Sequence, residues 1–202
     1  AVAYACHPDA WGVQIVFDNQ VILGTRARKT RTKSFNAFSS IDYPETAMFR
    51  DRRLIQFLQR PAEYTHAVFS TALDPNVFVL RLVPGMRADI IPMLEGRYRA
   101  LVLESFGVGG LPGGDDGAMF AAVRDWCGAG HLAVFTTQVP HEGSDLAVYE
   151  VGRAAKALPG VLEAHDMTPE ATAVKLMWVL GQTTDRAEAE KLFLTPVQWD
   201  IL

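Results

Sequence analysis

The sequence predicts an α/β protein whose C-terminal part has three layers, a parallel sheet with helices on both faces. Three observations support this fold class. Strand-type and helix-type segments alternate from residue 77 onward, glycine or proline marks the end of most segments, and the 202 residues are 49% hydrophobic and 21% charged. That composition is typical of a globular protein and not of a disordered chain.

The part of the chain before residue 61 contains short elements. Residues 1–6 are apolar and compatible with a helix that His7-Pro8 would end. Residues 13–17 and 21–23 are strand-type and flank Asp18-Asn19, so they predict a β-hairpin. The remaining segments are a polar and basic stretch at 24–33, an irregular stretch at 35–44, and a connector or edge segment at 50–61.

Longer alternating elements follow residue 76. We predict strands at residues 77–82, 100–103, 132–136 and 161–162, and helices at residues 88–94, 118–127, 146–158, 169–180 and from 185 onward. Thr168 is a good N-cap, Pro169 suits the first helical position, and Gly181 is expected to end that helix.

A glycine-rich loop at residues 104–114 follows the second of these strands. Ligands of α/β sheets bind where parallel strands end, and glycine lets the backbone approach a ligand or a neighbouring chain closely. Gly107 and Gly109 fit the start of a dinucleotide-binding G-x-G-x-x-G motif, but Pro112 stands at its last glycine and no P-loop lysine follows. A tight turn without a ligand is the alternative.

Charge and cysteine content exclude several classes of function. The net charge of −4 argues against nucleic acid as the main partner, because phosphate binding needs a positive surface. Cys6 and Cys127 are too few and too far apart for a disulfide scaffold, which indicates a reducing compartment. No apolar run approaches the roughly 20 residues of a membrane span. The five histidines lack metal-type spacing, so we expect no bound metal. We also expect no membrane contact and no cofactor.

The stretch from Gly24 to Lys33 carries five cations within eight residues, which are Arg26, Arg28, Lys29, Arg31 and Lys33. One interpretation is a solvated basic loop. The functional interpretation is a lysine whose cationic neighbours disfavour its own charge and so lower its pKa. Such a lysine can take a proton from a hydroxyl group or a bound water.

Three segments together resemble the bacterial L-asparaginase family. Residues 1–29 look like the middle of such an enzyme, with strand, turn, strand, Gly24 and then an active-site lysine. Residues 105–109 resemble its strand-end Gly-Val-Gly loop, and residues 166–176 resemble its helix near the C-terminus. They occur in the family's order and cover essentially the whole chain. The resemblance is closest to the cytoplasmic type I branch, and the tRNA-dependent amidotransferase subunit is a second relative.

The resemblance implies hydrolysis of L-asparagine to L-aspartate and ammonia, with Lys29 as a catalytic residue. The family also uses a threonine nucleophile in a Thr-Gly-Gly-Thr loop and a second threonine in a Gly-Thr-Asp-Thr loop. Neither loop occurs in these 202 residues. We therefore expect that the N-terminal catalytic portion is missing and that this chain alone is inactive.

Weaker expectations concern the glycine-rich loop. Family members commonly place an asparagine after Gly-Val-Gly, where this chain has Gly110. Thr137, Gly109 and Gly110 are candidates for contacts to substrate or to an effector. Glu104 stands where an asparagine-regulated type I enzyme has an arginine, and it would repel the effector's carboxylate.

The resemblance also implies a domain organisation. Residues 1–60 would be the end of a first α/β domain, 61–76 a linker, and 77–202 the complete C-terminal α/β domain. A homo-oligomer is expected, with L-asparagine or a related small amide as ligand of the complete enzyme. The alternative is a non-catalytic ligand-binding or dimerisation module.

Overall fold

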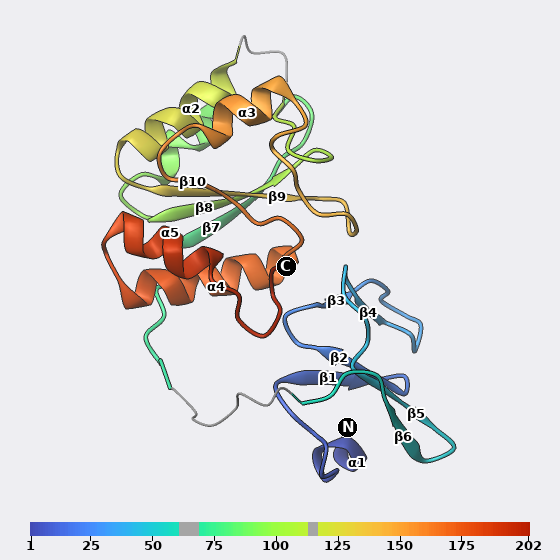
Figure 1. Cartoon of the computed structure of the whole chain (residues 1–202). Helices are drawn as coiled ribbons and strands as arrows, with labels where there is room; N and C mark the ends of the chain where they lie inside the picture. Colours follow the sequence, from blue (N-terminus) through green and yellow to red (C-terminus); the bar gives the residue numbers. More distant parts are fainter. Residues whose placement is uncertain (61–68, 113–116) are drawn as a thin grey trace.

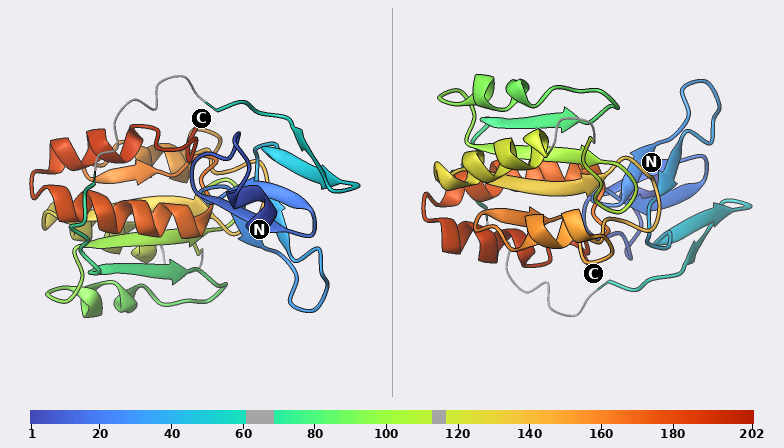
Figure 2. Two further views of the ribbon diagram at one scale, coloured as in Figure 1. Left: turned by 90° about the horizontal axis from the view of Figure 1, so that it is seen from below. Right: turned by 90° about the horizontal axis from the view of Figure 1, so that it is seen from above.

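The computed structural model describes residues 1–60, 69–112 and 117–202, which form two parts (Figure 1). Antiparallel strands build the part before residue 61, and a parallel sheet with helices builds the part after residue 76. Two further views show the first part beside the end of the parallel sheet toward which its strands run (Figure 2). Residues that follow these strands therefore meet the first part.

The first part begins with the short helix α1 (Val2–Ala5) and contains two sheets. The larger sheet has the order β1-β2-β5-β6, with β1 at Gln14–Phe17, β2 at Gln20–Leu23, β5 at Ala47–Arg50 and β6 at Arg53–Gln56. The smaller sheet pairs β3 (Ala27–Lys29) with β4 (Phe38–Ser40). The predicted hairpin is confirmed, because β1 and β2 pair across Asp18 and Asn19, both of which have positive φ.

One prediction for the first part needs correction, and another is confirmed with an addition. The segment 35–44 is not wholly irregular, because β4 lies within it and pairs with β3. The segment 50–61 does contain an edge strand, as expected, but that strand belongs to the hairpin β5-β6. Its turn is formed by Asp51 and Arg52, both with positive φ, and the charges around this turn hide the strand pattern on either side.

The second part confirms the predicted fold class. Its parallel sheet has the order β10-β9-β8-β7, with β7 at Val77–Arg81, β8 at Ala100–Ser105, β9 at Leu132–Thr137 and β10 at Val161–Glu163. One face is covered by α2 (Ala118–Gly128) and α3 (Glu150–Lys156), and the other by α4 (Pro169–Gln182) and α5 (Arg186–Leu194) (Figure 1).

Alternation along the buried strand β8 divides the core in two. Ala100 and Val102 pack with α4 and α5, whereas Leu101 and Leu103 pack with α2. Because both faces are covered, the strand is apolar at each of these positions, as expected for the middle of a parallel sheet.

Three helices differ from the predictions. Residues 88–94 form two 3₁₀ turns, Ala88–Ile90 and Pro92–Leu94, because Pro92 has no N–H to donate to Ala88 in an α-helix. The third predicted helix starts only at α3, and before it the Leu146 N–H donates to Glu163 Oε1 at 2.7 Å.

The fourth helix does not end at Gly181 but continues to Gln182. A Cβ on Gly181 would lie 2.4 Å from the backbone oxygen of Ala72. The glycine therefore allows the incoming chain to pack closely against α4. At its start α4 behaves as predicted, because the Thr168 hydroxyl accepts a hydrogen bond from the Ala171 N–H at 3.1 Å.

Candidate functional site

Residues 106–110 of the glycine-rich loop form a compact turn after β8, and residues 113 and 114 of that loop lie outside the described residues. The Phe106 N–H donates to the Gly110 carbonyl at 2.9 Å, and the Gly110 N–H donates back at 2.7 Å. Gly109 has a φ of +152°, and a Cβ there would lie 2.5 Å from the side chain of Leu146. The Asp145 N–H donates to the Val108 carbonyl at 2.8 Å, which fastens the loop to the segment before α3.

Thr137 ends β9 beside this loop and is buried. Its hydroxyl donates to the carbonyl of Gly107 and accepts from the Val139 N–H at 3.0 Å. The structure thus brings Thr137 to the same edge of the sheet as Gly109 and Gly110. The Thr137 side chain binds protein backbone at this edge.

Glu104 lies near the end of β8 with its charge already paired. Arg81 Nη1 is 3.1 Å from Glu104 Oε2, and the Glu104 side chain is only 12% exposed. The Gln138 side-chain amide donates to the Glu104 carbonyl at 2.8 Å and to the Leu82 carbonyl at 2.6 Å. Paired with Arg81, Glu104 does not present a free negative charge at this position.

Lys29 lies at the end of β3 and is exposed. Its Nζ is 5.9 Å from the centroid of the Phe38 ring, directly across the β3-β4 ladder. Among the described residues, no hydrogen bond or ion pair connects the Lys29 side chain to Thr137, Gly109 or Gly110. The lysine and the glycine-rich loop therefore form two separate candidate sites in this chain.

The arginines around Lys29 each have an acceptor of their own. Arg28 Nε lies 3.4 Å from Glu170 Oε1, and Arg31 Nη1 donates to the Asn36 carbonyl at 2.9 Å. Arg26 pairs with Asp166. Arg26 and Arg28 thus contact the second part of the chain, whereas residues 29–36 are exposed.

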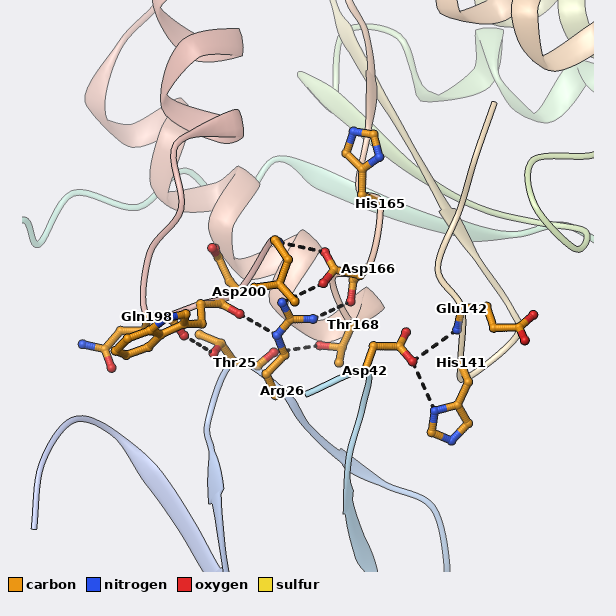
Figure 3. Close-up of polar contacts among 12 residues, drawn as sticks. Thr25, Arg26, Asp42, His141, Glu142, His165, Asp166, Thr168, Gln198 and Asp200 are labelled. Atoms are coloured by element: carbon orange, nitrogen blue, oxygen red, sulfur yellow. Dashed lines mark hydrogen bonds and ion pairs between the residues drawn. The ribbon is translucent and has the colours of Figure 1, made fainter. Parts of the chain in front are cut away.

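Arg26 is the residue that the sequence does not single out. Its side chain is fully buried between the two parts of the chain. Nη2 lies 2.8 Å from Asp166 Oδ2, and Nη1 donates to the Asp166 carbonyl at 2.9 Å (Figure 3). Nε donates to the Trp199 carbonyl. A buried charge needs such partners, and the planar guanidinium fork suits them.

Further contacts surround Arg26 at the junction of the two parts. The Thr25 hydroxyl donates to the Gln198 carbonyl at 2.8 Å. Asp42 accepts from the Glu142 N–H at 3.2 Å and lies 3.3 Å from His141 Nδ1 (Figure 3). The partners in the second part therefore follow β9 and β10 or belong to the C-terminal segment. The carboxyl end of the parallel sheet is where α/β proteins place their sites.

The family models match both parts of the chain. The model "Asparaginase, N-terminal" matches residues 1–63, and the model "Glutaminase/Asparaginase C-terminal domain" matches residues 76–193. The chain belongs to the asparaginase family. This confirms the family that the three segments indicated.

Relatives of this asparaginase-family chain are considerably longer. An L-asparaginase of Thermococcus kodakarensis is 38% identical over 182 residues, which are 90% of this chain and 54% of the relative. A glutamyl-tRNA(Gln) amidotransferase subunit of Metallosphaera sedula is 33% identical over 178 residues, which are 85% of this chain and 39% of the relative. The chain thus spans about half the length, or less, of these curated relatives.

Solved structures show the same fold. The thermostable L-asparaginase from Thermococcus kodakarensis superposes with a TM-score of 0.92 at 34% identity, covering 100% of this chain and 60% of that one. L-asparaginase I from Vibrio cholerae superposes with a TM-score of 0.78 at 23% identity, covering 94% of this chain and 57% of that one. The likeness to the Vibrio structure shows the fold alone.

Two hollows lie close to the segment that carries Lys29. A polar cavity of about 500 Å³ is lined by Arg31, Phe38, Ser40 and Glu45, among others, and burial raises the pKa of Glu45. An apolar groove of about 560 Å³ lies between residues 13–25, α4 and the C-terminal segment.

The chemistry of the remaining residues is limited. Within 1–60, 69–112 and 117–202, no three His, Cys, Asp or Glu side chains are grouped as a metal ion would need. No helix of these ranges has the length and apolar character to cross a membrane. Cys6 is an exposed thiol and Cys127 a buried one, and burial raises the pKa of Cys127 to about 11.

Proposed function

We propose that residues 1–202 are part of a cytoplasmic L-asparaginase of the type I branch. The complete enzyme would hydrolyse the side-chain amide of L-asparagine to give L-aspartate and ammonia. The observation that carries this proposal is Lys29, which stands five residues after Gly24 within the segment matched by the N-terminal asparaginase model. Its exposed position at the end of β3 leaves the amine free to meet a reacting group.

Lys29 alone cannot perform this reaction. A lysine that accepts a proton must be paired with a nucleophile whose proton it removes directly or through a neighbour. In the family that nucleophile is a threonine hydroxyl, which attacks the amide carbon and releases ammonia, and water then hydrolyses the ester. These 202 residues contain no Thr-Gly-Gly-Thr and no Gly-Thr-Asp-Thr loop. We infer that the chain as it stands is inactive.

The same proposal covers the organisation of the chain. Residues 1–60 would be the end of a first domain, 61–76 the linker, of which 61–68 lie outside the described residues, and 77–202 the C-terminal domain. A second contact surface at the edge of the parallel sheet would comprise Thr137, Gly109 and Gly110. It would contact a neighbouring protomer, the substrate or an effector. The tight packing of Gly109 against Leu146 supports a loop held in one shape for such a contact.

A chimera tests the proposed function. The N-terminal segment of the Thermococcus kodakarensis L-asparaginase that carries the family's threonine loops is placed before Ala1, and ammonia release from asparagine is measured. We expect turnover from the chimera and none from residues 1–202 alone. Activity of the 202-residue chain at a normal enzymatic rate, or a folded chimera without activity, would contradict the proposal.

A further inference from the structure

Arg26 lies three residues before Lys29 and is held in one orientation. Its guanidinium group has acceptors on three sides, the Asp166 carboxylate, the Asp166 carbonyl and the Trp199 carbonyl. Asp166 is itself fixed, because the Leu202 N–H donates to its Oδ1 at 3.1 Å. A planar fork with fixed acceptors can take only one position, unlike the point charge of a lysine.

The backbone of Arg26 connects this anchor to the strands around Lys29. The Arg26 N–H donates to the Leu23 carbonyl at 3.0 Å, at the end of β2. The Ile41 N–H donates to the Arg26 carbonyl at 2.9 Å, just after β4. The Tyr43 ring centroid is 5.3 Å from the Arg26 guanidinium carbon. Residue 26 is therefore the point where the small sheet, the large sheet and the second part of the chain meet.

The strand that carries Lys29 depends on this anchor, because β3 has only three residues. Among the described strands it pairs with β4 alone, and isolated two-stranded pairs are marginally stable. Arg26 and Arg28 both contact the second part, through Asp166 and Glu170. Since side chains alternate along a strand, Lys29 is directed to the opposite face.

We infer that Arg26 is a positioning residue for Lys29. It fixes the start of β3 against Asp166 and Trp199, and so determines where the Lys29 amine lies relative to any reacting group. The inference rests on the proposed catalytic role of Lys29. A displacement of about 1 Å in a catalytic group costs on the order of 100-fold in rate. An Arg26→Lys variant retains the charge but loses the fork, so it should produce this displacement.

The first test uses the 202-residue chain and needs no activity. The ε-CH₂ resonance of Lys29 senses the nearby Phe38 ring, and Phe38→Leu gives its value without the ring. In Arg26→Lys and in Asp166→Asn, we expect this resonance to move toward the Phe38→Leu value while circular dichroism shows a folded chain. Arg124→Gln is the control, because Arg124 pairs with its exposed neighbour Asp125, and it should change nothing.

Asp166→Asn keeps Arg26 and both carbonyl acceptors, so it is the second variant to measure if Arg26→Lys does not fold. An unchanged Lys29 resonance in a folded variant of either kind would overturn the inference.

The second test uses the active chimera. We expect Arg26→Lys to lower kcat about 100-fold and leave KM within about twofold, at a temperature where the variant is folded. Lys29→Met separates the two proposals. If Lys29→Met retains turnover, the proposed function is wrong. If Lys29→Met abolishes turnover and Arg26→Lys retains it fully, only the role of Arg26 is wrong.

Discussion

Lys29 is the residue on which the proposed chemistry depends. In the active chimera, Lys29→Met removes the amine that accepts the proton and keeps a side chain of similar length. We expect a loss of at least about 10³-fold in kcat, as for removal of one member of a catalytic group that acts as a unit. Lys33→Met is the matched control in the same basic segment and should be nearly silent. Equal turnover of wild type and Lys29→Met would remove the assignment.

The two cysteines make a second prediction at the residue scale. Cys6 is exposed, whereas Cys127 is 2% exposed and burial raises its pKa to about 11. Below pH 9, a thiol reagent should modify Cys6 rapidly and Cys127 only after unfolding. The unfolded thiol ionises near its ordinary pKa of 9.0 and the folded one near 11. The free energy of unfolding should therefore decrease as the pH rises from 9 to 11.

A Cys127→Ser variant measures this pH dependence by comparison. Its free energy of unfolding should decrease less than that of the wild type between pH 9 and 11, the interval set by the two pKa values. Modification of Cys127 in the native chain at the rate of Cys6 would contradict the prediction.

The family resemblance points to Lys29 and not to Arg26, and the reason is physical. The spacing from Gly24 is local, so it can be read from the sequence. The acceptors of Arg26 lie 140 and 173 residues further along the chain. Nothing in the basic segment indicates which of its five cations is buried, because burial depends on these distant partners.

At the scale of elements, the glycine-rich loop makes a prediction with an internal control. Gly109→Ala combines a φ of +152° with a Cβ 2.5 Å from Leu146, whereas Gly107→Ala has a φ of +51° and open space. We expect Gly109→Ala to destabilise by about 2–4 kcal/mol and Gly107→Ala by about 1 kcal/mol. Urea unfolding of both variants gives the comparison. Equal losses would show that Leu146 does not restrict the loop.

Elements with strong local signals were predicted and weak ones were not. The strands of the parallel sheet are buried apolar runs bounded by turns, and the N-cap at Thr168 is a local hydrogen bond, so both were predicted. The β3-β4 pair has three residues per strand and little apolar pattern, and its pairing comes from tertiary contacts. The prediction of a helix at residues 88–94 did not take into account that Pro92 has no N–H to donate.

At the scale of the whole molecule, we predict self-association of residues 1–202. Exposed apolar side chains are numerous before residue 61 and include Val2, Val13, Phe17, Phe35, Ile55 and Phe57. The outer strands β1 and β6 leave sheet edges unpaired within this part. Such surfaces favour association, and oligomers of one chain are usually closed and symmetric. Light scattering across micromolar concentrations is the measurement, and a monomer throughout that range would contradict the prediction.

The buried Arg26 also has a consequence for synthesis on the ribosome. A chain is made from its N-terminal end, so the Arg26 side chain is present long before residues 166 and 199. During that interval its charge has no native acceptor and must remain hydrated, which keeps the segment around Lys29 from reaching its final packing. The lysine-bearing strand would then be made well before its partners in the second part and would settle only after them. Only when Trp199 has left the exit tunnel can the two parts of the chain close on Arg26.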